Sequence, residues 1–173
     1  MRQILSSFIA LAVSRRGHRR KVKRRISIGL LAIAAFAANL LAGELVNVDQ
    51  NGVALQGYDP VTYFTDGRPA KGSQEFAASY NGAIYYFASA EHKAQFEKEP
   101  GKYAPLFGGY CAFAVSRGAT APISVDAFQI LHGQLVLQKN KDILKRWQED
   151  SESNFQKAEA NWPRIVQKNA EKK

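Results

Sequence analysis

The sequence predicts an α+β fold: a small antiparallel hairpin–helix core, then a second hairpin and C-terminal helices. Three observations predict it. An Asn-Gly pair at 81–82 separates two β-prone runs, a capped helical segment ends at Pro100, and a helical pattern starts at Asp142. Asn-Gly tolerates the positive φ angles of a tight turn, so the pair favours a hairpin.

The first hairpin is predicted from residues 76–80 and 83–87, and a helix follows over 90–99. Ser89 stands at the N-cap of this helix, where its hydroxyl can accept a free backbone amide. Pro100 should end the helix, because its ring cannot continue the hydrogen-bond ladder. Residues 100–103 are predicted to form a turn. An earlier run, Val-Thr-Tyr-Phe at 61–64, is also β-prone.

The second hairpin is predicted from residues 127–131 and 134–138, around a turn at His132. Helices over 141–167 are expected to form a lid on the core, with an interruption at Pro163, and the residues after 167 should be frayed. No period of 20–50 residues repeats. The apolar stripes of the lid are Ile143, Leu144 and Trp147, and then Phe155, Ala158 and Trp162.

The positive charge of the chain is confined to its N-terminus. Nine of the 24 Lys and Arg residues lie in residues 1–43, which contain no acid, so residues 44–173 carry 15 basic and 15 acidic residues. This balance argues against a nucleic-acid partner. The uncharged run 26–43 is typical of a signal peptide or signal anchor. We expect export to the periplasm, or attachment to the inner membrane through this segment if it is not cleaved.

Residues 44–167 are therefore predicted to form one domain, and they contain a specific pattern. It runs Tyr80-x-Gly82-x-x-Tyr85-x-Phe87-x-Ser89, then Phe96, Pro100 and Tyr103, with Asp59-Pro60-Val61 upstream. This pattern resembles a YHS domain over about 59–103. The wider chain, from 57 to 163, resembles an exported subfamily of YHS-domain (seleno)proteins whose function is not established.

The resemblance implies a metal site in an altered form. In metal-associated YHS domains, cysteines occupy the positions held here by Thr62, Ala88 and His92, so only an imidazole remains. The single cysteine of the chain, Cys111, lies elsewhere. A thiolate and a neutral imidazole suit copper or zinc, and a four-coordinate zinc site would also need a carboxylate such as Glu91. The leading hypothesis is a periplasmic soft-metal binding module with Cys111 and His92 as ligands.

Two other hypotheses stay open. Cys111 is the nucleophile of a thiol redox protein, which would need a partner protein or an external thiol because the chain has no second cysteine. Alternatively, the chain is a non-enzymatic interaction domain in which Cys111 is a small buried side chain. Asp59 and His132 are interpreted as turn residues.

The sequence contains no Gly-rich phosphate loop, no Gly-x-Ser-x-Gly elbow and no His-Glu-x-x-His helix. Whether the chain is an enzyme stays open, and a non-enzymatic role is favoured. Contact with a membrane is expected only through the N-terminal segment.

Overall fold

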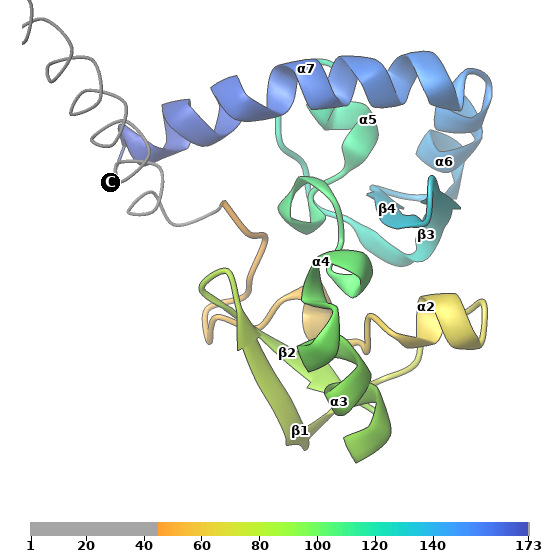
Figure 1. Ribbon diagram of the computed structural model, residues 1–173. Helices are drawn as coiled ribbons and strands as arrows, with labels where there is room; N and C mark the ends of the chain where they lie inside the picture. The colour runs from red at the N-terminus through yellow and green to blue at the C-terminus, as the bar shows by residue number, and fades with distance from the viewer. Residues whose placement is uncertain (1–44, 173) are drawn as a thin grey trace, which may run out of the picture. The chain divides into compact units, whose positions relative to one another are not determined.

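A computed structural model describes residues 45–172, so the predicted leader, 1–43, lies outside the described residues. The described chain has the predicted α+β fold, with two separate two-stranded antiparallel sheets and several helices (Figure 1). No helix within 45–172 is long and apolar enough to cross a membrane.

The first half of the described chain contains the predicted hairpin and helix. Its elements are η1 (Leu55–Gly57), α2 (Thr62–Thr65), β1 (Ser73–Tyr80), β2 (Ala83–Phe87), α3 (Ala90–Lys98) and α4 (Pro100–Tyr103). Asn81 and Gly82 have the positive φ angles expected of the turn, 50° and 77°. The Ser89 side chain caps α3 by accepting the amide of His92 at 3.2 Å. The helix ends before Pro100, as predicted, but the expected turn at 100–103 is one helical turn.

The β-prone run at 61–64 is helical, so this part of the prediction is wrong. The Asp59 side chain accepts the backbone amide of Val61 at 2.8 Å, and the Thr62 hydroxyl donates to the Asp59 carbonyl at 2.9 Å. Local bonds of this kind between side chains and backbone compete with extended structure. They start α2 despite the β propensity of its residues.

The second half contains the predicted second hairpin and the C-terminal helices. Its elements are η2 (Phe107–Gly109), α5 (Ala112–Val115), β3 (Ser124–Leu131), β4 (Gln134–Gln138), α6 (Lys141–Gln148) and α7 (Ser151–Ala170). The expected interruption at Pro163 is absent, because α7 runs through this proline to Ala170. Proline removes one helical donor, and the apolar face of α7, with Phe155, Ala158 and Ile165 buried, holds the helix together. The helix also extends into the segment expected to be frayed.

The two hairpins have the same geometry, 51 residues apart. The long strand has 8 residues and the short strand 5 in both. In each hairpin, four consecutive residue pairs next to the turn are followed by a shift in register and then by one more pair. In the first hairpin the pair beside the turn is Tyr80 with Ala83, and the pair beyond the shift is Ser73 with Phe87. The equivalent pairs of the second hairpin are Leu131 with Gln134 and Ser124 with Gln138.

The similarity extends into the loops that precede the hairpins. The bond from Ala54 N to Ile84 O, 2.8 Å long, corresponds to the bond from Leu106 N to Leu135 O at 2.9 Å. Likewise, the bond from Asp59 N to Ala70 O at 2.9 Å corresponds to that from Cys111 N to Ala121 O at 3.1 Å. The domain therefore contains two copies of one hairpin–helix unit, a first unit (residues 54–98) and a second unit (residues 106–148). In this correspondence Cys111 is the equivalent of Asp59, and Ile143 is the equivalent of His92.

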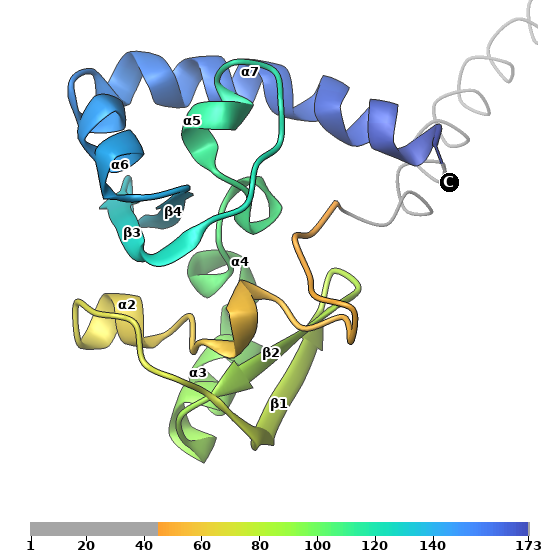
Figure 2. The same ribbon diagram turned by 180° about the vertical axis from the view of Figure 1, so that it is seen from behind.

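The two units share a buried cluster. From behind, α2 of the first unit lies next to the hairpin of the second unit (Figure 2). Tyr63 of α2 donates its hydroxyl proton to the Val125 carbonyl at 3.2 Å, and its ring contacts Phe128 edge-on with centroids 4.7 Å apart. The buried members of this inter-unit cluster are Leu55, Tyr63, Cys111, Ile123, Val125, Leu135 and Leu137.

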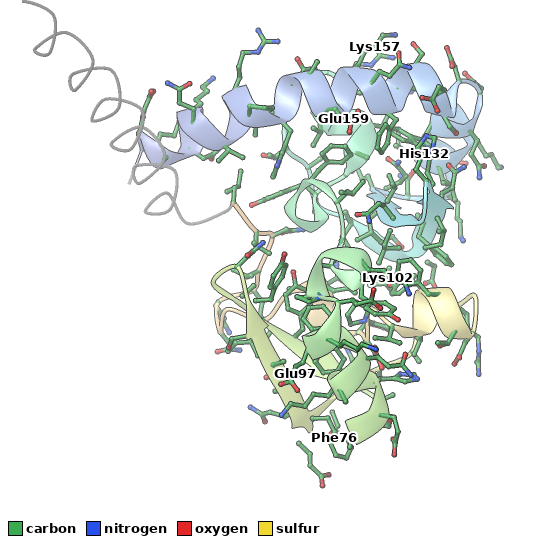
Figure 3. All side chains as sticks on the ribbon, viewed as in Figure 1. Phe76, Glu97, Lys102, His132, Lys157 and Glu159 are labelled. Carbon is green, nitrogen blue, oxygen red and sulfur yellow. The ribbon has the colours of Figure 1, made fainter. Side chains whose placement is uncertain are left out.

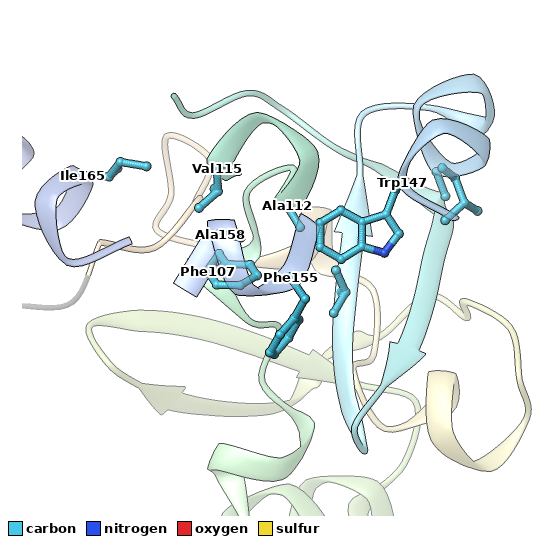
Figure 4. Close-up of a cluster of buried hydrophobic side chains, with 10 residues drawn as sticks. Phe107, Ala112, Val115, Trp147, Phe155, Ala158 and Ile165 are labelled. Carbon is cyan, nitrogen blue, oxygen red and sulfur yellow. The ribbon is translucent and has the colours of Figure 1, made fainter. Parts of the chain in front are cut away.

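Two further clusters complete the core. One is formed by the first unit together with Tyr103 of α4, and in it Phe96 of α3 packs against Tyr85 and Phe87 of β2. In the other, α7 covers the second unit, and Phe155 and Ala158 meet Trp147 of α6 and residues of η2 and α5 (Figure 4). The buried side chains of all three clusters belong to residues 54–165.

We predict that Gly72→Ala destabilises the domain far more than Gly101→Ala. A Cβ atom at Gly72 would lie 2.5 Å from the backbone carbon of Tyr86, whereas at Gly101 the nearest atom is the Tyr80 hydroxyl at 3.8 Å. Overpacking of this kind costs about 1–3 kcal/mol. Urea unfolding of both variants measures the difference, and equal midpoints would contradict the prediction.

Candidate functional site

A buried carboxylate lies at the centre of the first unit. The side chain of Asp59 has 0% exposure. Its Oδ1 accepts the backbone amide of Val61, and its Oδ2 accepts that of Ala88, both at 2.8 Å. Because Ala88 follows β2 directly, this carboxylate fastens the loop before α2 to the end of the strand.

His92 completes the set of groups around this carboxylate. Its Nδ1 lies 2.6 Å from Oδ2 of Asp59, and its side chain is 20% exposed. A carboxylate can only accept, so Nδ1 carries the proton that is shared with Asp59. In the neutral ring, Nε2 then holds the free lone pair. The same pairing of a carboxylate behind an imidazole orients metal-binding histidines in many proteins.

The start of α3 brings a further carboxylate into the neighbourhood of His92. Glu91 is exposed, and its own backbone amide, followed by the Ser89 hydroxyl, lowers the pKa of its side chain.

The three positions that the YHS resemblance singles out converge on Asp59. The Thr62 hydroxyl bonds to its carbonyl, and Ala88 and His92 bond to its carboxylate. The interpretation of Asp59 as a turn residue is correct for its bond to Val61, but it misses the contact with His92. No local pattern could have revealed that contact, because 33 residues separate the two side chains.

Cys111 lies in the inter-unit cluster with 2% exposure. Its Sγ donates to Oε1 of Gln138 at 3.3 Å, and the backbone amide of Phe113 donates to the same oxygen at 3.0 Å. Gln138 has 0% exposure, and its Nε2 is the one buried side-chain nitrogen or oxygen among residues 45–172 that lacks a hydrogen-bond partner. Burial, and then the charge of Asp126, raise the pKa of Tyr63 in the same cluster.

The two predicted metal ligands occupy different units. In the described part of the chain, no three residues of the types His, Cys, Asp or Glu are grouped so that they could hold a metal ion. Cys111 lies in the second unit, at the place that corresponds to Asp59.

His132 is a turn residue, as predicted, with φ of 51° between β3 and β4. Its Nε2 lies 2.9 Å from Oε2 of Glu152, and both side chains are more than half exposed, at 54% and 58%. Figure 3 shows His132 beside α7, in accord with its edge-on contact with Phe155. This pair resembles the Asp59–His92 pair in chemistry but lies in solvent.

A cavity of about 350 Å³ opens between the first hairpin, η2 and α7. Its aromatic walls include Tyr80, Phe107 and Trp162, and Glu159 is its acidic residue. Asp59, His92 and Cys111 do not line it, so the cavity is separate from both polar clusters.

Comparison with known proteins identifies one domain. The YHS domain family matches residues 61–106, and residues 61–106 therefore form a YHS domain. No curated protein and no solved structure matches the chain. The match contains α3 with His92, but it begins after Asp59 and ends before Cys111 and most of the second unit.

We predict that Asp59→Asn lowers the free energy of unfolding by about 3 kcal/mol. The NH₂ group of the asparagine would replace one of the two carboxylate oxygens, so a donor that this oxygen now accepts would lose its acceptor. Asp66→Asn is the matched control, since Asp66 is exposed at the end of α2. Urea unfolding compares the two variants. A loss in Asp59→Asn no larger than that in the control would contradict the central position of this carboxylate.

Proposed function

We propose that the chain is an exported YHS-domain protein that binds a copper or zinc ion through Nε2 of His92. The observation that carries this proposal is the 2.6 Å contact between Nδ1 of His92 and the buried Asp59. It fixes the ring and its tautomer before any ion arrives, and neutral imidazole is a good ligand for both metals.

The donor atoms around His92 fit a metal site that keeps coordination positions free for other ligands. They do not fit a site in which the protein supplies every ligand. The oxygens of Asp59 are already occupied by two backbone amides and the imidazole. A structural zinc site needs four ligands, and the described residues offer no group of three. His92 therefore supplies one ligand, and the remaining positions are filled by a second molecule. Such a module holds and transfers an ion and needs no catalytic group.

Cys111 is a weaker candidate ligand than His92. Its thiol is buried in the inter-unit cluster and bonds to Gln138, whereas the imidazole of His92 is partly exposed. The proposal therefore ranks His92 first and leaves Cys111 outside the site.

Export is proposed from the leader. The basic block, the uncharged run 26–43 and the charge balance of 44–173 all support it. A cleaved signal would leave a mature N-terminus close to residue 43, and N-terminal sequencing of the protein from a periplasmic fraction tests this. An N-terminus that starts at residue 1 in the membrane fraction would indicate an anchor instead.

The metal proposal predicts that His92→Ala loses at least about tenfold in affinity for copper(I) or zinc, because it removes the ligand itself, and mutation of only an outer-shell partner of a ligand already costs about tenfold or more. Residues 44–173 are reduced and titrated without oxygen, and bound ions are counted by native mass spectrometry. The matched control is His132→Ala, which removes the exposed imidazole that also pairs with a carboxylate. This control and Cys111→Ser should both retain the ion.

Each other outcome has a distinct meaning. If Cys111→Ser loses the bound ion and His92→Ala retains it, the ligand is Cys111 of the second unit. If the wild type retains neither ion at micromolar concentrations, the metal proposal is wrong, and the thiol redox protein and the interaction domain are the remaining interpretations.

A further inference from the structure

The equivalence of Asp59 and Cys111 gives the second unit an unusual polar centre. In the first unit, a carboxylate oxygen accepts the amide of Val61. In the second unit, the equivalent amide, that of Phe113, donates to the Gln138 side chain instead. The place of two carboxylate oxygens is thus taken by a thiol and an amide group.

The Gln138 side chain has hydrogen-bond donors for its oxygen but no acceptor for its nitrogen. Its Oε1 accepts two bonds, from Phe113 and from the thiol of Cys111, while its Nε2 has two N–H groups and no acceptor. Exchange of the amide oxygen and nitrogen does not help, because the Phe113 amide would then face a donor. A buried donor without a partner is costly. The amide group that accepts from the thiol of Cys111 through Oε1 therefore lacks an acceptor for its Nε2.

We infer that Cys111 is a modification site, at which a hydroperoxide oxidises the thiol to a sulfenic acid whose oxygen accepts a hydrogen bond from Nε2 of Gln138. The S–O bond forms as the peroxide O–O bond breaks. Sulfur loses two electrons, the peroxide is reduced to an alcohol or water, and the thiol proton goes to the leaving oxygen. The new S–OH group donates to Oε1 of Gln138, as the thiol does now.

The surroundings suit a persistent sulfenic acid. The chain has no second cysteine, so the acid cannot close a disulfide within the molecule and is reduced only by an external thiol. With 2% exposure, Cys111 is open only to a small oxidant during local opening, and the same burial slows a second oxidation. This inference does not depend on the metal proposal, because the thiol bonds to Gln138 in the second unit and His92 to Asp59 in the first.

The test treats reduced residues 44–173 with hydrogen peroxide and follows Cys111 by intact and peptide mass spectrometry. A 1,3-dione added after unfolding traps the sulfenic acid. We expect one added oxygen on Cys111, which dithiothreitol removes. We also expect the oxidised protein to melt at the same temperature as the reduced protein or higher, because the missing acceptor is then present.

Gln138→Leu tests the role of the amide, and Gln129→Leu is its control. The Gln129 side chain is half-buried in the same hairpin, and its Oε1 accepts from Trp147 at 2.9 Å, away from the thiol. Gln138→Leu removes both hydrogen bonds to the sulfenic acid, so it should shorten the lifetime of the singly oxidised form at least about fivefold, whereas Gln129→Leu should leave that lifetime unchanged.

Three results would overturn the inference. The first is a folded wild type that stays unoxidised at a peroxide concentration that oxidises the urea-unfolded chain. The second is an equal lifetime of the sulfenic acid in the two glutamine variants. The third is a melting temperature that falls on oxidation.

Discussion

The buried carboxylate of Asp59 is the interaction on which the first unit depends. It joins the loop before α2, the end of β2 and the first turn of α3 at one point. A carboxylate removed from water is tolerated only where donors replace the water, and here two backbone amides and the imidazole of His92 do so. The contact that stabilises the fold therefore also orients the residue that we propose binds the metal.

The two units meet one structural requirement in two ways. The first unit uses the carboxylate of Asp59, and the second unit uses the thiol of Cys111 with the amide of Gln138. The position of His92 is held in the second unit by Ile143, which offers no ligand atom. The proposed metal chemistry therefore belongs to the first unit alone. The second unit contributes most of the buried residues of the inter-unit cluster, packs against α2 and contains the sulfur that we infer is oxidised.

The sequence predicted those parts of the fold that depend on interactions between residues close together in the chain. The turn at Asn81, the cap at Ser89 and the end of α3 before Pro100 each depend on neighbours only a few residues away. The sequence did not predict contacts between residues far apart in the chain. The sequence did not predict the bond between Asp59 and His92, because 33 residues separate them. It did not predict the repeat either, because equivalent residues of the two hairpins, 51 positions apart, seldom have the same identity.

The most direct test of the proposed function is a measurement of the ring nitrogens of His92 by ¹⁵N NMR during a zinc titration. Residues 44–173 contain only two histidines, so the two sets of signals can be assigned with one variant. The account predicts that Nδ1 keeps its proton throughout and that the large shift occurs at Nε2 of His92. A shift at Nδ1, or a response confined to His132, would contradict it.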